Sequence, residues 1–182
     1  MKLDSIYKTT KTGLTVEFRS AKEDDAEALI DYLKKTCGET RFLLSEPEEV
    51  TFTVDGEKAF LKSYEESGNS VMINAYVDGK LAGNASFAPV GDRMRVKHRA
   101  DMGIALFQEY CHQGIGELLM EIIIEKAREC GYEILELEVV SSNVNAFRLY
   151  QKHGFRECGK TVRAFKYKDG TYDSEIHMQL ML

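Results

Sequence analysis

The sequence lacks several features that mark other protein classes. Of its 182 residues only 2 are proline and none is tryptophan, and no proline- or serine-rich stretch divides the chain. Lysine and arginine (24) are outnumbered by aspartate and glutamate (30), so the formal net charge is −6. Because no basic stripe is available to neutralise phosphates, we expect no nucleic-acid partner.

Long apolar runs are absent as well. The most apolar window, residues 118–124, already contains Glu121, so no membrane-spanning segment and no membrane partner are expected. Residues 1–5 lack the apolar stretch of a signal peptide. The four cysteines have no metal-ligand spacing; they are Cys37, Cys111, Cys130 and Cys158. These absences predict free thiols, no metal site and a cytoplasmic protein.

What the chain contains is the composition of a folded domain. Hydrophobic residues make up 43% of it and charged residues 30%, which suffices for a buried core and is unlike a disordered tail. A length of 182 residues fits one domain of roughly 100–200 residues. We therefore predict that residues 1–182 form a single domain.

Strand and helix patterns alternate along the chain. Apolar alternation or short apolar runs predict strands near 14–19, 71–76, 81–87, 96–107, 134–140, 161–168 and 176–182. Helical spacing of apolar residues predicts helices near 24–33, 55–66, 115–130 and 143–153. The order β-α-α-β-β-β-α-β-α-β-β predicts an α/β (α+β) fold. We expect a mixed, mostly antiparallel sheet of six to seven strands with about four helices on both faces.

A glycine-containing turn at residues 113–117, Gln-Gly-Ile-Gly-Glu, leads directly into the most apolar predicted helix. The first N–H groups of a helix lack intrahelical acceptors and lie at the positive end of its dipole, so this turn suits a phosphate. Two nucleotide motifs are not matched: Leu119 replaces the third glycine of a dinucleotide fingerprint, and no Gly-Lys-Ser/Thr is present. An ordinary turn remains the alternative.

A second motif, residues 143–155, reads Asn-Val-Asn-Ala-Phe-Arg-Leu-Tyr-Gln-Lys-His-Gly-Phe. It matches N-x-x-A-x-x-L-Y-x-K-x-G-F at every specified position. Together with the turn, whose family pattern is Q/R-x-x-G-x-G/A, it resembles the GNAT superfamily of acyl-CoA-dependent N-acetyltransferases. The turn departs from that pattern at its first position, which is Cys111. That departure puts a side-chain contact to the phosphates in doubt, whereas backbone contacts are unaffected.

The resemblance implies acetyl-CoA as the acetyl donor and no metal. It implies that backbone groups of Ile104, Ala105 and Leu106 pair with the pantetheine arm. The pyrophosphate would be held by the backbone from Cys111 to Gly116, that is by Cys111, His112, Gln113, Gly114, Ile115 and Gly116. Asn143 is a predicted helix N-cap, and in the family the matching residue often also touches the cofactor.

The resemblance also implies direct attack of an amine on the thioester in a ternary complex. Tyr150 matches the family's acid, because a phenol is protonated at neutral pH and can donate to the leaving sulfur; the alternative is a purely packed side chain. Glu138 is the first candidate base, because a central buried strand would raise its pKa; the alternative is a carboxylate on the solvated end of the strand that pairs with a neighbour. Asp101 is the second candidate base, with an acceptor-orienting or purely structural carboxylate as the alternatives. The backbone N–H of Leu106 is the expected oxyanion donor.

The tail, residues 159–180, resembles members that acetylate ribosomal-protein N-termini or polyamines, a likeness that does not fix the acceptor; we expect a small-molecule amine or a peptide N-terminus. An acidic run at 46–57 falls where acceptor-binding helices lie in the family and would favour a cationic acceptor; the alternative is a solvated charged face. The C-terminal hairpin offers a strand edge through which a homodimer could form. The alternative function is a CoA-binding regulatory module without turnover. A Cys111–His112 nucleophile is disfavoured, since loop neighbours rarely align for proton transfer.

Overall fold

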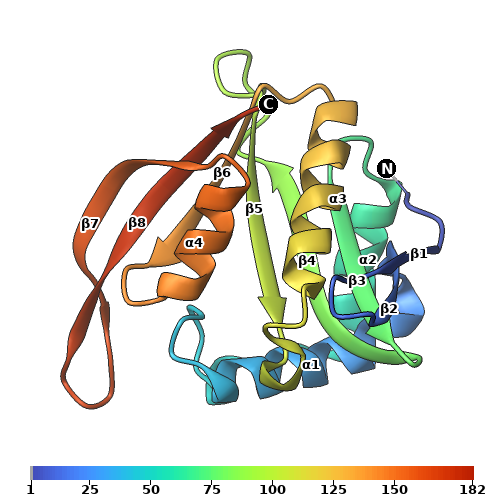
Figure 1. The fold of residues 1–182 in the computed structure, drawn as a ribbon, viewed down its shortest axis with the longest axis horizontal. Helices are drawn as coiled ribbons and strands as arrows, with labels where there is room; N and C mark the ends of the chain where they lie inside the picture. Colours follow the sequence, from blue (N-terminus) through green and yellow to red (C-terminus); the bar gives the residue numbers. More distant parts are fainter. Residues whose placement is uncertain (1) are drawn as a thin grey trace.

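An eight-stranded sheet forms the centre of the part of the chain that the computed structural model describes, residues 2–182 (Figure 1). Its spatial order is β1-β2-β3-β4-β5-β6-β8-β7. The strands are β1 (Ile6–Thr9), β2 (Thr15–Ser20), β3 (Val71–Val77), β4 (Lys80–Pro89), β5 (Arg99–Leu106), β6 (Ile134–Val140), β7 (Arg156–Lys166) and β8 (Tyr172–Met181). Every neighbouring pair is antiparallel except β5 and β6, which run parallel.

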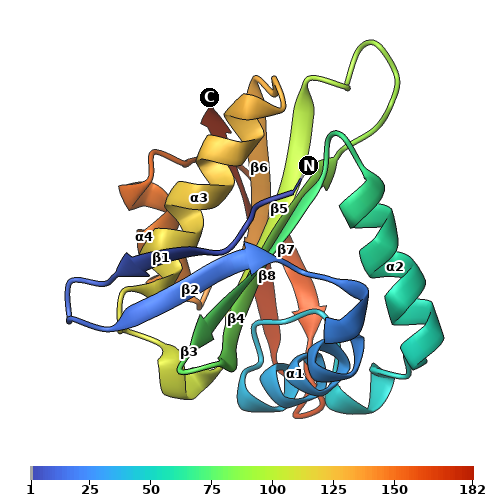
Figure 2. The same ribbon diagram turned by 90° about the vertical axis from the view of Figure 1, so that its right-hand side faces the viewer.

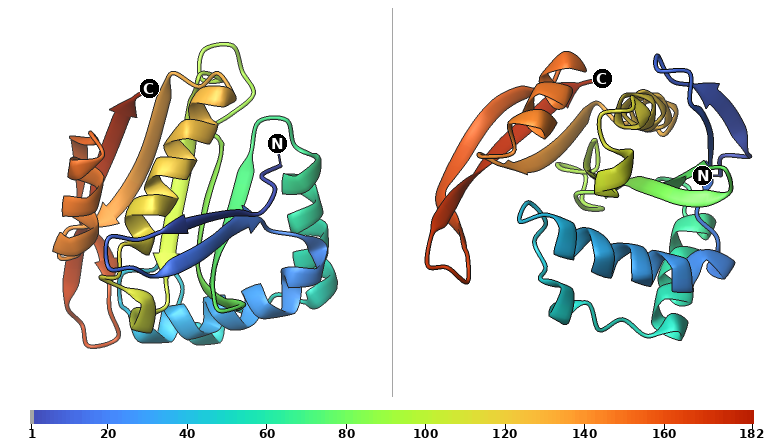
Figure 3. Two further views of the ribbon diagram at one scale, coloured as in Figure 1. Left: turned by 45° about the vertical axis from the view of Figure 1, so that its right-hand side comes forward. Right: turned by 60° about the horizontal axis from the view of Figure 1, so that its bottom comes forward.

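Helices cover both faces of this sheet, as Figures 2 and 3 show. α3 (Ile115–Glu129) and α4 (Val144–Lys152) lie on one face; α1 (Ala26–Glu39) and α2 (Val54–Glu66) lie on the other. The prediction of a mixed, mostly antiparallel sheet with helices on both faces is confirmed. Within the described residues, no helix has both the length and the apolar character needed to cross a bilayer.

The predicted number of strands, six to seven, is too small by the strand β1. Its four residues are too few to show a period of two, and two of them are exposed. These residues form a strand because they pair with β2, and in this pairing Ile6 lies opposite Phe18. This pairing also brings Thr10, just after β1, against the turn that precedes α3.

Two further strand boundaries differ from the prediction. β5 begins at Arg99 because residues 93–99 form turns, with backbone N–H groups of Val96 and Arg99 bonded to Arg93 and Val96. β7 begins earlier than 161 and continues through an irregularity between Thr161 and Phe165. Its length is set by pairing with β8, which sequence periodicity does not reveal.

The main core lies between the sheet and α3. The stripe of α3 that the sequence predicts is buried, and Ile115, Leu119 and Ile123 are fully inaccessible. Burial of such side chains contributes roughly 1.5–3 kcal/mol each. Leu135 and Met178, from β6 and β8, belong to the same cluster. This core fixes the amino end of α3 relative to β5 and β6, where the candidate site lies.

Candidate active site

β5 and β6 pair along only a short part of their length. Their register joins Arg99 to Ile134, Ala100 to Leu135 and Asp101 to Glu136, and ends there. Beyond Asp101 the two strands diverge, as Figure 1 shows. The space between them opens into a cleft of about 910 Å³, within the range of small-molecule sites.

The cleft brings together most of the residues predicted for the cofactor. It is lined by Ile104, Ala105, Leu106, Cys111, His112, Gly114, Gly116 and Asn143, and also by Glu138 and Tyr150. Gln113 and Ile115 do not line it. Gln113 instead donates to the carbonyl of Glu109 at 2.7 Å, and Ile115 is buried in the core. Only the backbone of these two residues is available to a ligand at the turn.

The turn before α3 has the backbone that its glycine predicts. Gly114 is the N-cap and adopts φ +88°, a conformation that favours glycine. A Cβ added there would meet the Cβ of Thr10 at 3.2 Å. The first turn of α3 therefore presents N–H groups without intrahelical acceptors toward the cleft.

Tyr150 is the one tyrosine among the cleft-lining residues, and it extends from α4. It is only 7% exposed and packs against Phe155, with ring centroids 6.0 Å apart. Its hydroxyl has no hydrogen-bond partner within residues 2–182. Burial raises the pKa of Tyr150 to about 12, so the phenol stays protonated at neutral pH and is free to donate. Asn143 caps the same helix through Ala146 N–H, at 3.2 Å, as predicted.

Of the two interpretations of Glu138, burial on the strand is wrong, and a solvated carboxylate paired with a neighbour is confirmed. Leu137 and Val139 point into the core beneath α3, and the strand alternation turns Glu138 to the opposite face. No helix covers that part of the sheet, so the side chain is 56% exposed. Its carboxylate forms an ion pair with His177 of β8, with Oε1 and Nδ1 3.3 Å apart.

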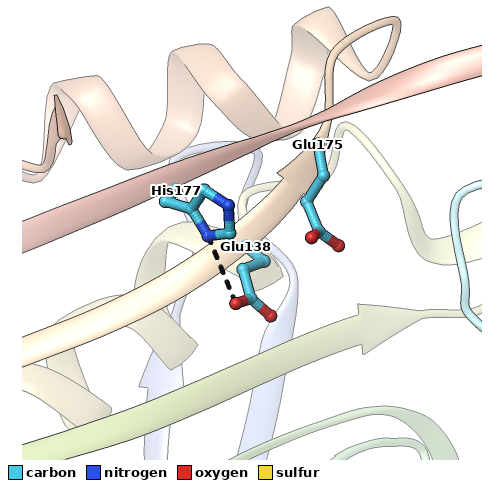
Figure 4. Close-up of side chains that lie close together, drawn as sticks. All are labelled: Glu138, Glu175 and His177. Atoms are coloured by element: carbon cyan, nitrogen blue, oxygen red, sulfur yellow. Dashed lines mark ion pairs between the residues drawn. The ribbon is translucent and has the colours of Figure 1, made fainter. Parts of the chain in front are cut away.

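Glu138 belongs to a small cluster that the sequence did not indicate. Glu138, Glu175 and His177 each place one side-chain oxygen or nitrogen within 4.8 Å of the others, and Figure 4 shows them on the same side of β6 and β8. The other ring nitrogen of His177, Nε2, lies 2.9 Å from Thr161 Oγ1. His177 is thus held between a hydroxyl and a carboxylate. The sequence around His177 has no ligand spacing that would have indicated this cluster.

Asp101 lines a second, smaller hollow beside the cleft. This side pocket has a volume of about 330 Å³ and is lined by Arg99, Asp101, Glu136, Leu137, Glu138, Cys158, Gly159, His177, Met178 and Gln179. Partial burial, together with the carboxylates of Glu138 and Glu136, raises the pKa of Asp101 to about 6. Glu138 lines both the cleft and the side pocket, so the two spaces meet at this residue.

Cys111 does not form a reactive pair with His112. The Sγ atom of Cys111 contacts the carbonyl oxygen of Phe107 at 3.6 Å. Burial, with a smaller effect from Glu39, raises the pKa of the Cys111 thiol, which disfavours the thiolate that a nucleophile needs.

The acidic run at 46–57 lines neither space. Glu46 and Glu48 instead pair with Lys168 at the tip of the β7–β8 hairpin, with N–O distances of 3.1 and 3.3 Å. These two carboxylates therefore contribute to a contact between a loop and a hairpin, in keeping with a solvated charged face. The carboxylates that line the cleft are those of Glu39, Glu117 and Glu138.

Two cations on the cleft wall escaped sequence analysis. Arg148 and Lys152 lie one turn apart on α4, and both line the cleft. Lys152 also pairs with Glu117 of α3. Their i, i+4 spacing inside the second motif was the available signal.

Comparison with known proteins decides the family. A family model described as the acetyltransferase (GNAT) family matches residues 38–155, which include the turn and the second motif. The chain belongs to this family. As a GNAT member it is an acyl-CoA-dependent N-acetyltransferase, as predicted.

Relatives of this GNAT protein act on different acceptors. Streptothricin acetyltransferase of Streptomyces lavendulae is 30% identical over 175 residues, covering 83% of this chain and 87% of that protein. The ribosomal protein bS18-alanine N-acetyltransferase of Escherichia coli is 31% identical over 102 residues, covering 56% of this chain and 69% of that enzyme.

Solved structures match the fold of this GNAT protein. A GNAT-family acetyltransferase from Streptococcus pneumoniae has a TM-score of 0.87 at 30% identity, covering 92% of this chain and 99% of that one. A Salmonella typhimurium protein solved with its cofactor acetyl-CoA has a TM-score of 0.80 at 20% identity. It covers 92% of this chain and 94% of that one, and at this identity the likeness concerns the fold alone.

Proposed function

We propose that this protein transfers the acetyl group of acetyl-CoA to a primary amine by direct attack within a ternary complex. The observation that carries the proposal is the cleft between β5 and β6, which has an open helix N-terminus along it and the unpartnered hydroxyl of Tyr150 inside it. A small-molecule amine or a peptide N-terminus would be the acceptor.

Acetyl-CoA would lie along the diverging strands. Backbone groups of residues 104–106 would pair with the pantetheine arm in place of the strand that β6 no longer supplies. The N–H groups of residues 111–116 would hold the pyrophosphate. Arg148 and Lys152 add positive charge on the same wall, which suits the phosphates of the donor.

The reaction would proceed by nucleophilic attack of the amine nitrogen on the thioester carbonyl carbon. The oxyanion would accept a hydrogen bond from the N–H of Leu106. When the carbon–sulfur bond breaks, the leaving thiolate would take the proton of Tyr150. The proton lost by the amine would pass to Glu138, where the cleft and the side pocket meet, or to Asp101 in the side pocket.

Tyr150→Phe tests the acid role directly. We expect kcat to fall by about 100-fold or more, while the acetyl-CoA dissociation constant stays unchanged because the ring remains packed. The measurement is amine-dependent release of the CoA thiol, with acetyl-CoA binding followed by calorimetry. Tyr7→Phe, on an exposed side chain of β1, is the matched control. Turnover in Tyr150→Phe equal to wild type would rule out the acid assignment.

The second candidate function is a CoA-binding module without turnover. Cys111 in place of the family's Gln or Arg is the feature that favours it. A ligand at about 100 times its Kd adds roughly 2.7 kcal/mol to the stability of the protein that binds it. Such stabilisation by acetyl-CoA, combined with no thiol release for any amine, would support the module and exclude the enzyme.

A further inference from the structure

We propose that the acceptor is a small amine that carries a second cationic group, and that Asp101 in the side pocket binds this second cation. The inference rests on the proposed function, since it takes the side pocket as the acceptor end of the acetyl-transfer site. It is carried by the balance of charge in the pocket, by the size of the pocket and by its junction with the cleft.

The side pocket holds more negative charge than its own cations neutralise. Three carboxylates line it, from Asp101, Glu136 and Glu138, and its wall contains a single arginine, Arg99. Arg99 is already engaged: its guanidinium makes hydrogen bonds of 2.7, 2.9 and 3.2 Å to Glu136. Gln179 donates to the same carboxylate at 3.0 Å, so Glu136 is fully satisfied.

Asp101 and Glu138 are the two carboxylates of the pocket that no lysine or arginine in the described part of the chain neutralises. Within residues 2–182 no lysine, arginine or histidine forms an ion pair with Asp101, and the partner of Glu138 is the imidazole of His177. Glu175, which approaches Glu138 from β8, has no ion pair among these residues either. One reacting ammonium neutralises one carboxylate and must lose its proton to react. The pocket therefore retains charge for a second cation.

The crowding of these carboxylates changes the pKa of Asp101. Partial burial and the negative charges of Glu138 and Glu136 raise the pKa of Asp101 to about 6. A cation bound between these groups relieves the repulsion, so the free energy that crowding costs becomes available for binding.

The dimensions favour a small molecule over a peptide. A volume of about 330 Å³ is near the lower limit of small-molecule pockets, roughly 300–1,000 Å³. A ligand that this pocket encloses is therefore small.

A separate observation points to a reacting ligand in the adjoining cleft. The hydroxyl of Tyr150 is part of a side chain only 7% exposed, lines the cleft and lacks a partner. Glu138 lines both spaces, so an amine beside Glu138 enters the cleft while the rest of the molecule extends toward Asp101.

The test compares three amines of equal length: 1,4-diaminobutane, butylamine and 4-aminobutanoate. With wild-type protein and a chelator present, we expect kcat/KM for the diamine to exceed that for butylamine by about tenfold or more, as one charge-assisted contact provides. The amino acid, whose second group is negative, should be the poorest acceptor. Thiol release and the mass of the acetylated product are the readouts.

Asp101→Asn should reduce the ratio of kcat/KM for diamine over butylamine to near one. The ratio separates the two roles of Asp101, because loss of a base lowers both amines alike whereas loss of a cation contact lowers the diamine alone. Asp101→Glu, which keeps the charge, should retain the preference. The matched control is Glu125→Gln, which removes one negative charge from α3, on the opposite face of the sheet.

Equal kcat/KM values for diamine and butylamine in wild type would overturn the inference and leave the proposed function standing. An unchanged ratio in Asp101→Asn would do the same. If no amine yields an acetylated product, the proposed function itself fails and the inference fails with it.

Discussion

Among single residues, Asp101 links the charge of the site to the stability of the fold. Its pKa is raised to about 6 by partial burial and by two neighbouring carboxylates, against about 3.9 in an unfolded chain. The folded state therefore binds this proton more tightly than the unfolded state. The stabilisation is complete below the unfolded pKa and is lost as pH rises through the folded pKa.

Asp101→Asn removes this pH-dependent loss. We expect the variant to melt at a higher temperature than wild type at neutral pH. The difference should develop as pH rises from about 4 to about 6 and be absent at lower pH. Thermal unfolding followed by circular dichroism over this range is the measurement. A variant that is less stable than wild type at neutral pH would show that Asp101 is not crowded by like charge.

Gly83 is a second residue whose identity matters to the cleft. It lies in β4 opposite Leu106 of β5, and a Cβ there would clash with the Leu106 side chain and approach the carbonyl oxygen of Ala105 to 2.8 Å. Glycine inside a strand often marks such a close backbone approach. Gly83 within the predicted strand 81–87 was therefore an available indication of this close approach, and the sequence analysis did not use it.

Gly83→Ala should displace the backbone that is expected to pair with pantetheine. We expect acetyl-CoA affinity to fall by about tenfold, since small misplacements of a positioned group cost this much or more. Calorimetric titration with acetyl-CoA checks it. Gly68→Ala, where a Cβ meets nothing within 4 Å, should bind as wild type does. Unchanged acetyl-CoA affinity in Gly83→Ala would show that the β5 backbone beside Gly83 does not bind the donor.

At the scale of elements, the segment after α1, residues 40–50, contacts the β7–β8 hairpin. The guanidinium of Arg41 stacks on Tyr167 at 3.6 Å from the ring centroid and donates to Thr171 at 2.9 Å. Phe42 and Leu43, next along the chain, line the cleft. The contact thus positions one wall of the cleft from a distant part of the sequence.

Arg41→Ala should loosen this wall without unfolding the protein. Exposed polar contacts contribute little to global stability, so we expect an almost unchanged melting temperature. KM for the amine should rise several-fold, and hydrogen exchange should accelerate in residues 40–50 and 166–172. Arg128→Ala, an exposed position on α3, is the control. Unchanged exchange in both segments would contradict this positioning role.

Elements that follow from local pattern were predictable, and those set by distant partners were not. The periodicity of α3, its glycine turn and the cap at Asn143 are local, and each lies where predicted. The exposure of Glu138 depends on where α1 and α2 end over the sheet. The pairing of Lys168 with Glu46 depends on how a hairpin meets a loop more than a hundred residues away.

For the whole molecule, the topology itself creates the candidate site. The parallel pair β5 and β6 sits inside an otherwise antiparallel sheet, with α3 connecting the two strands. The strands separate after three paired positions, and we propose that donor and acceptor meet in the space between them. The sequence contains the two motifs and predicted the order of these elements, but it did not predict the side pocket, which four separate strands, β5, β6, β7 and β8, assemble.

Direct transfer from donor to acceptor is tested by following radiolabelled acetyl-CoA with and without an amine. The account predicts no label on the protein in the absence of amine and, once amine is added, one labelled acetyl group on the amine per thiol released. Label bound to the protein before amine is added, at Cys111 or elsewhere, would contradict direct attack in a ternary complex.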